Sequence, residues 1–198
     1  MDAPAADLSP KAAQILDAAL TCIARVGLTK TTLDDVAREA KCARATVYRS
    51  FANKQRLITA LVAREAGVLR AAVVAQSASA ETLADAIAIV VTTSVDFLGS
   101  HPALTFVCAH EPEILVPFLA FEREDAVLRT AAVLVAPALT RFVDDADATR
   151  LGEWIARLTL SYLFTPSENF DIADPRHVRA LVDDFVVPGF VNSERVSR

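Results

Sequence analysis

Two short helical patterns separated by three residues, Lys41-Cys42-Ala43, constrain the fold more than any other feature of the sequence. They lie between Thr31 and Leu57, and the pair Thr32 and Asp35 is a capping-box-like start for the first. The second is basic: residues 41–56 include five Lys or Arg and no Asp or Glu. Two helices joined by a tight turn, the second of them basic, are typical of a helix-turn-helix that docks in the DNA major groove.

The remainder of the chain also predicts helices. With 198 residues, 53% of them hydrophobic, the chain has ample material for a core and is not disordered. Five glycines are few, and no alternating run closes on Asn-Gly or Asp-Gly, so strand signals are missing from the sequence. We expect an all-α protein of about nine helices, with residues 1–53 as a three-helix DNA-binding domain and residues 54–198 as a second helical domain.

Local signals predict where several helices begin and end. Ser9-Pro10 is a helix start and Gly27 a helix stop, and Asn53 caps a long helix that runs to about Ser77. Residues 81–99 are apolar on nearly every side, which predicts an interior helix. The later expectations are a helical stretch over 118–142 interrupted at Pro137, an acidic loop over 144–147, a helix over 149–164, and a last helix from Asp174-Pro175 to Pro188-Gly189.

Charge is distributed unevenly along the chain. Residues 1–55 carry eight Lys or Arg and six Asp or Glu, so the remainder has 12 of the 20 basic and 19 of the 25 acidic side chains. An acidic body repels nucleic acid, which confines DNA contact to the N-terminal part. The sixteen arginines against four lysines suggest a GC-rich bacterial source.

The sequence favours a cytoplasmic protein with no membrane partner. The first ten residues are acidic and lack an apolar core, so they do not form a signal peptide. Asp85 and Asp96 bound the longest apolar run, which we interpret as too short to span a membrane. Three scattered cysteines indicate reduced thiols.

The last two predicted helices are more apolar than a surface helix requires. Such pairs commonly form four-helix dimer interfaces, and a helix-turn-helix protein needs a dimer to span two half-sites. We expect a homodimer. The predicted interface residues are Leu151, Ile155, Tyr162, Val178, Leu181, Val182 and Phe185.

The stretch Thr31–Leu57 resembles the DNA-binding signature of the TetR family of transcriptional regulators. In that family a TT-x-x-D-[IV]-A helix is followed by a three-residue turn and then T-[VLI]-Y-x-x-F-x-[NS]-K-x-x-L. The matching residues here are Thr31, Thr32, Asp35, Val36, Ala37, Thr46, Val47, Tyr48, Phe51, Asn53, Lys54 and Leu57. The turn departs from the family's Gly-[VI]-Ser: Lys41 replaces a glycine that often has positive φ, and Ala43 replaces a capping serine worth about 0.5–2 kcal/mol.

The predicted DNA contacts follow from this placement. Arg44 and Thr46 begin the recognition helix, and Arg44 either bridges guanine O6 and N7 or contacts phosphate. Arg49 reaches bases or backbone, and Ala45 touches a thymine methyl. The resemblance implies phosphate contacts for Tyr48 and Lys54, with a packed tyrosine whose hydroxyl is solvated as the alternative for Tyr48. Thr31 and Thr32 contact phosphate at the start of the first helix of the pair, unless Thr32 only caps that helix. The full predicted set is Thr31, Thr32, Lys41, Arg44, Ala45, Thr46, Tyr48, Arg49 and Lys54.

The resemblance also implies an apolar ligand cavity in the second domain, so that residues 54–198 bind an effector and dimerise. Few lone polar groups lie in these stretches, which favours a small apolar effector such as a fatty acyl or aromatic compound. Its binding would release a repressor from its operator. Aromatic residues at helical spacing more often pack in a core than contact a ligand. With that alternative favoured for each, the candidate ligand residues are Phe97, His101, Phe106, His110, Phe118, Phe121, Trp154 and Leu158.

A few residues could support other chemistry. Cys108, His110 and Glu111 combine soft and hard metal ligands, but zinc would need regular spacing and a second cluster, so we expect no metal and no cofactor. Cys42 is either a redox-sensitive thiol or a small residue that fills the turn. Without a catalytic cluster we expect no enzyme; the alternative is a helical ligand-binding protein or enzyme that lacks specific DNA binding. The sequence does not separate a repressor from an activator.

Overall fold

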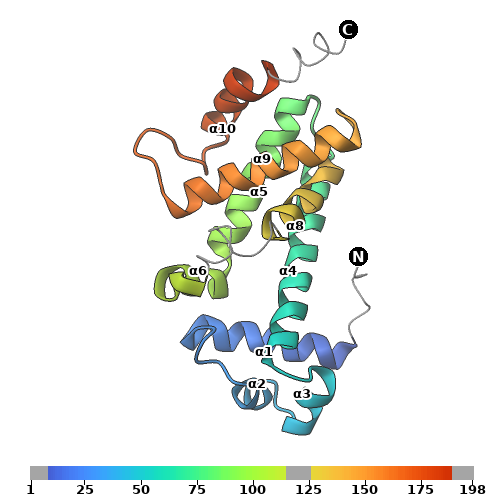
Figure 1. Cartoon of the computed structure of the whole chain (residues 1–198), viewed down its shortest axis with the longest axis vertical. Coiled ribbons are helices and arrows are strands. Elements are labelled where there is room, and N and C mark those ends of the chain that lie inside the picture. Colours follow the sequence, from blue (N-terminus) through green and yellow to red (C-terminus); the bar gives the residue numbers. More distant parts are fainter. Residues whose placement is uncertain (1–8, 115–125, 189–198) are drawn as a thin grey trace. The chain divides into compact units, whose positions relative to one another are not determined.

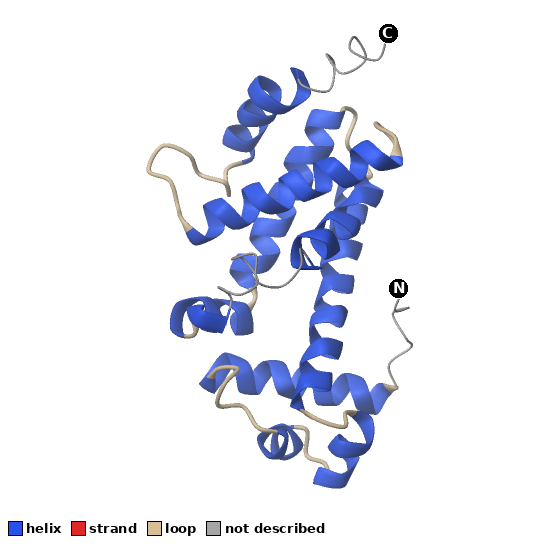
Figure 2. Cartoon of the chain, viewed as in Figure 1, coloured by secondary structure: helices blue, strands red, loops and turns tan. Residues whose placement is uncertain are grey.

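The computed structural model describes residues 9–114 and 126–188, and every regular element among them is helical (Figure 2). Nine α-helices and three short 3-10 or π segments lie in this part of the chain, which confirms the all-α prediction. The elements are α1 Pro10–Val26, α2 Leu33–Glu39, α3 Arg44–Ser50, α4 Lys54–Ser77, α5 Leu83–Ser100, α6 Pro102–His110, η1 Pro112–Ile114, α8 Ala126–Val135, η2 Ala136–Ala138, α9 Asp145–Phe164, α10 Pro175–Leu181 and η3 Val182–Val186.

The chain divides into two compact units, and each is described by itself. Unit 1 comprises Met1–Val68 and Leu98–Glu124, and unit 2 comprises Leu69–Phe97 and Asp125–Arg198. Helices α4 and α5 therefore contribute to both units. The compact units do not coincide with a division at residue 53, because α6 and the first part of α4 pack with the N-terminal helices.

Unit 1 has its core between α1, α2, α3, the start of α4 and α6 (Figure 1). Ile15, Val36, Val47 and Leu57 supply one large buried side chain from each of the first four helices, all at most 1% exposed. Helix α6 adds Val107, which is 5% exposed. These contacts fix the two short helices α2 and α3, each of which has seven residues and would not be stable alone.

The predicted helix ends of unit 1 are confirmed. The Ser9 side chain accepts a hydrogen bond at the start of α1, and Gly27 ends that helix with φ 89°. The Asn53 side chain accepts a 2.9 Å hydrogen bond from the Arg56 N–H and so caps α4. Because these signals act within one turn of helix, the sequence is sufficient to locate them.

Unit 2 is built around α5, whose apolar residues are largely buried. The helix is 18 residues long with a mean hydropathy of 1.5, so by length and composition it meets the minimum for a membrane span, contrary to the sequence-based expectation. Its burial inside the unit is also that of a core helix: Ile87, Val90 and Val91 are fully buried. In the same unit Gly152 of α9 lies against α8 so closely that a Cβ would stand 2.6 Å from the Ala132 carbonyl oxygen.

One expected boundary in unit 2 is confirmed and another changes in the structure. The predicted interruption at Pro137 is confirmed, since α8 ends at Val135 and a 3-10 turn follows. The acidic segment 144–147 is different: Asp144 caps α9, which begins at Asp145 rather than near residue 149. Carboxylates in the first turn of a helix interact favourably with the positive end of the helix dipole, which explains why an acidic run starts a helix here.

Four of the seven predicted dimer residues belong to the core of unit 2 instead. Leu151, Ile155, Val178 and Val182 are at most 1% exposed within the single chain, so their side chains have no surface left for a partner. Helical spacing identifies an apolar stripe but does not say whether the protein's own core or a second subunit covers it. Among the other three, Tyr162 and Leu181 are half-buried and Phe185 is 78% exposed.

Candidate nucleic-acid interface

Helix α2 begins with a complete capping box. The Thr32 hydroxyl accepts a 3.2 Å hydrogen bond from the Asp35 N–H, and Asp35 Oδ2 accepts a 3.1 Å bond from the Thr32 N–H. Hydrogen bonds from Thr32, followed by the nearby Arg38 guanidinium, lower the pKa of the Asp35 carboxyl. Thr32 is exposed and its side chain caps the helix, as one of the two expected roles requires.

The turn between α2 and α3 carries both departures from the family pattern as real backbone features. Lys41 has φ 47°, the left-handed conformation that a glycine would adopt without cost. Ala43 occupies the N-cap of α3 and makes no side-chain cap. Packing fixes the helix instead, because Val47 is fully buried in the core of unit 1.

The outer face of this turn and of α3 carries most of the predicted DNA contacts. Thr46 is half-buried, whereas Tyr48 is 51% exposed. The Arg49 Nε lies 3.3 Å from the Ala45 carbonyl oxygen, so its side chain lies along the helix surface. The exposed members of the set are Lys41, Arg44, Ala45, Tyr48 and Arg49. This face carries three cations, a phenol and a methyl group.

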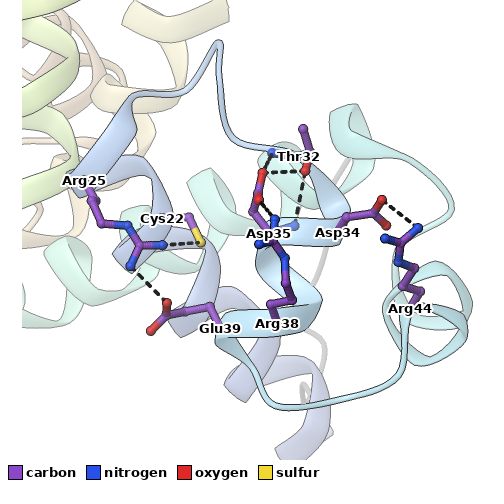
Figure 3. Close-up of polar contacts among 8 residues, drawn as sticks. All are labelled: Cys22, Arg25, Thr32, Asp34, Asp35, Arg38, Glu39 and Arg44. Carbon is purple, nitrogen blue, oxygen red and sulfur yellow. Dashed lines mark hydrogen bonds and ion pairs between the residues drawn. The ribbon is translucent and has the colours of Figure 1, made fainter.

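Each carboxylate of α2 pairs with an arginine (Figure 3). The pairs are Asp34–Arg44, Asp35–Arg38 and Glu39–Arg25. Asp34 reaches the recognition helix: its Oδ2 lies 2.9 Å from Nη1 of Arg44. Asp34 is not among the residues predicted from the sequence, although an acidic residue on the helix before a basic one is a signal that could have identified it.

Thr31 and Lys54 make their hydrogen bonds within unit 1. Thr31 is 2% exposed, and its hydroxyl donates a 2.6 Å hydrogen bond to the Gly27 carbonyl oxygen. Lys54 Nζ donates to the carbonyl oxygens of Leu28 and Thr29, at 2.6 and 2.9 Å. Burial lowers the pKa of the Lys54 ammonium, an effect that the nearby Glu111 carboxylate opposes. Both side chains thus stabilise the loop after α1.

Glu111 binds the N–H groups of the same loop. Its two carboxylate oxygens accept hydrogen bonds from the Leu28 and Thr29 N–H groups, at 2.6 and 3.0 Å. Burial alone would raise the pKa of the Glu111 carboxyl, but hydrogen bonds from Thr29 and Leu28 and the Lys54 charge together lower it. The carboxylate that the sequence offered as a metal ligand therefore joins the end of α6 to the loop before α2.

The candidate ligand residues have varied environments. In unit 1, His101 caps α6: its Nδ1 accepts a 3.2 Å hydrogen bond from the Leu104 N–H, and Nε2 lies 3.4 Å from Glu65 Oε2. His110 is exposed and stacks on Phe106 with ring centroids 4.4 Å apart. In unit 2 the candidates Phe97, Trp154 and Leu158 are half-buried. Phe118 and Phe121 lie outside the described residues.

The structure does not bring Cys108, His110 and Glu111 together as metal ligands. Glu111 is engaged by backbone N–H groups, and the Cys108 thiol has a pKa raised by burial, which opposes the thiolate that a metal needs. Within residues 9–114 and 126–188, no group of three or more His, Cys, Asp or Glu side chains is placed to hold a metal ion. Cys42 is half-buried and free.

Comparison with known proteins identifies the N-terminal segment. Residues 15–61 match the model of the tetR family of bacterial regulatory proteins. An HTH-type transcriptional regulator of Mycobacterium tuberculosis is 29% identical over 179 residues, which cover 88% of this chain and 83% of that protein. A second HTH-type regulator, YvkB of Bacillus subtilis, is 37% identical over 57 residues, or 29% of this chain and 30% of its own. These relatives are regulators, not enzymes.

Solved structures share the whole fold. The TetR family repressor AlkX from Dietzia sp. superposes with a TM-score of 0.63 at 20% identity, covering 93% of this chain and 96% of its own. The regulator FadR from Bacillus subtilis, solved with stearoyl-CoA, has a TM-score of 0.59 at 18% identity, covering 88% and 98%. With the capped α2, the buried Val47 of α3 and the basic outer face already described, residues 15–61 form a helix-turn-helix domain of the TetR family of transcriptional regulators.

Proposed function

We propose that this regulator is a cytoplasmic, bacterial homodimeric repressor that binds a palindromic operator and is released by a small apolar effector. The observation that supports operator binding is the exposure of polar side chains on the outer face of α3. Arg44, Tyr48 and Arg49 are exposed there while Val47 is fully buried, so the helix presents its polar side outward from a fixed base. A helix of this kind inserts its N-terminal residues among the base edges of the major groove.

Within this proposal the contacts divide into two classes. Arg44 and Ala45 begin α3 and read base edges, with Thr46 beside them. Lys41, Tyr48 and Arg49 contact phosphates and fix the register without reading sequence. Thr31 is left out of the interface, because its hydroxyl is buried and bonded within unit 1. Lys54 keeps one N–H donor beyond its two bonds to carbonyl oxygens and stays a proposed phosphate contact.

The effector is proposed from the chemistry of the relatives and of this chain together. FadR was solved with stearoyl-CoA, and AlkX is implicated in n-alkane degradation, so two structural neighbours are associated with long apolar chains. Half-buried Phe97, Trp154 and Leu158 offer apolar surface in unit 2. We therefore expect an acyl or aromatic ligand rather than a sugar or a metal ion.

One experiment tests first the binding to an operator and then the release by an effector. Selection of duplexes from a random library with the full chain should enrich a palindrome whose half-sites lie one helical turn, or a multiple of it, apart. The retained complex is then titrated with acyl-CoAs, alkanes and aromatic acids in separate runs. Failure to enrich any sequence would contradict operator binding, whereas enrichment with no release by any compound would contradict only the effector class.

A further inference from the structure

We propose that Asp34 is a specificity-determining residue of the DNA site, which positions the Arg44 guanidinium for reading guanine. The inference rests on the proposed function, since it requires α3 to face DNA. Asp34 stands in the first turn of α2 and Arg44 is the first residue of α3. Their ion pair, 2.9 Å between Oδ2 and Nη1, joins the two helices of the helix-turn-helix (Figure 3).

The other carboxylates of α2 have roles that Asp34 lacks. Asp35 forms the capping box and pairs with Arg38 on its own helix. Glu39 pairs with Arg25 and so ties α2 to α1. Asp34 forms no part of the capping box, and its ion pair is with the helix that enters the groove.

The Asp34–Arg44 ion pair contributes little to the stability of the folded protein. The Arg44 side chain is 71% exposed and that of Asp34 is 36% exposed, and ion pairs so open to solvent contribute little to folding. A carboxylate at the edge of a DNA-binding face also repels phosphate and lowers affinity for every duplex. An acid in this position therefore weakens general binding, and selectivity is the property that it can improve.

The geometry of arginine supplies the means. A guanidinium is planar and carries five N–H donors in a rigid fork, of which guanine O6 and N7 use two. With Nη1 against Asp34, Nε and Nη2 make no bond to any residue that the structure describes, so one edge remains for a base. A carboxylate that holds this long side chain before DNA arrives removes part of its ordering cost and restricts the direction in which the fork points.

The test uses the full chain and a consensus duplex selected from a random library. Dissociation constants are measured for that duplex and for duplexes substituted at each base pair, and Arg44→Ala identifies the guanine that Arg44 reads. Asp34→Asn should reduce the preference for that guanine at least fivefold, within the roughly 5- to 150-fold discrimination that a bidentate contact provides. The matched control is Glu39→Gln, which removes the same charge from α2 and should leave the preference unchanged.

Three results would overturn the proposal. Asp34→Asn could keep the full guanine preference, or it could tighten binding to all duplexes equally, so that Asp34 acts only as a charge. Arg44→Ala could change no base preference at all. If circular dichroism shows that Asp34→Asn is unfolded, Asp34→Ser replaces it: this variant also removes the carboxylate that pairs with Arg44, and it should lose the same preference. Absence of any enriched sequence with the unmodified protein would instead contradict the proposed function.

Discussion

At the scale of single residues, two opposite charges hold the loop that leads from α1 into the helix-turn-helix. Lys54 binds the carbonyl oxygens of Leu28 and Thr29, and Glu111 binds their N–H groups. Four backbone groups of a short loop are therefore satisfied by side chains from distant parts of the sequence. Because Glu111 directly follows α6, the position of α6 and that of the loop before α2 are linked.

Replacement of Lys54 should destabilise the protein without any involvement of DNA. Lys54→Met keeps the length of the stem but leaves two carbonyls and the Glu111 carboxylate without their cation. We expect the free energy of unfolding to fall by about 1–3 kcal/mol, measured by urea denaturation. Lys30→Met, at an exposed lysine of the same segment, is the control and should change it by less than about 0.5 kcal/mol. Equal stability of the two variants would contradict the anchor role.

Glu111 should contribute to the acid sensitivity of the fold. Its pKa is lowered in the folded protein, so the unfolded chain binds the proton more readily. The stabilisation is complete above the unfolded pKa of about 4.3 and is lost as the pH falls through the folded value. Glu111→Gln should therefore flatten the decline of unfolding free energy below about pH 5, whereas Glu113→Gln, at an exposed neighbour, should not. Identical pH profiles for the native chain and Glu111→Gln would contradict this assignment.

Residues with local partners were predictable from sequence, and residues with distant partners were not. Ser9, Thr32 and Asn53 cap helices within three residues of themselves, and the sequence identified all three. Glu111 acts on backbone groups 82 and 83 residues away, so its neighbours in sequence suggested a metal ligand instead. His101 likewise resembled a ligand contact, although it caps α6.

At the scale of elements, the recognition helix is the least supported of the three N-terminal helices. Helix α1 and helix α2 have side-chain caps, whereas α3 has none at Ala43. Ala43→Ser supplies the missing acceptor and should raise the free energy of unfolding by about 0.5–2 kcal/mol, measured by urea denaturation. Ala45→Ser, inside the same helix, is the control and should give no gain. A stabilisation by both substitutions would exclude capping as the cause.

The contact between α8 and α9 depends on a single missing side chain. A Cβ at Gly152 would stand 2.6 Å from the Ala132 carbonyl oxygen and 3.0 Å from a Val135 methyl carbon. Gly152→Ala must push the helices apart and should lower the melting temperature, with a cost of about 1–3 kcal/mol. Gly67 and Gly99 have nothing within 4 Å of an added Cβ, so the same substitution at either should be neutral or stabilising. Tolerance of Gly152→Ala would show that α8 shifts freely.

At the scale of the whole molecule, the all-α class and the family were predictable because they rest on periodicity and on one contiguous motif. The division into units was not, because α4 and α5 each belong to both units and no break in composition marks a boundary. The same limit applied to the dimer surface. The apolar stripes on α9 and α10 correctly predicted that these residues are buried. However, Leu151 and Val178 are buried in the chain's own core and not against a second subunit.

The proposed homodimer therefore depends on the apolar surface that the chain leaves exposed. Phe185 in η3 is 78% exposed, although a large aromatic side chain gains most from burial. In a two-fold dimer each substitution acts twice, so Phe185→Glu places two carboxylates in the interface and should weaken association by roughly a hundredfold or more. Sedimentation velocity at micromolar concentration should then show monomers. Val62→Glu on α4, at a side chain that is 60% exposed and outside the proposed interface, should leave the dimer intact. If the dimer survives Phe185→Glu, the interface lies on another surface. If the native chain sediments as a monomer, the proposed homodimer is wrong.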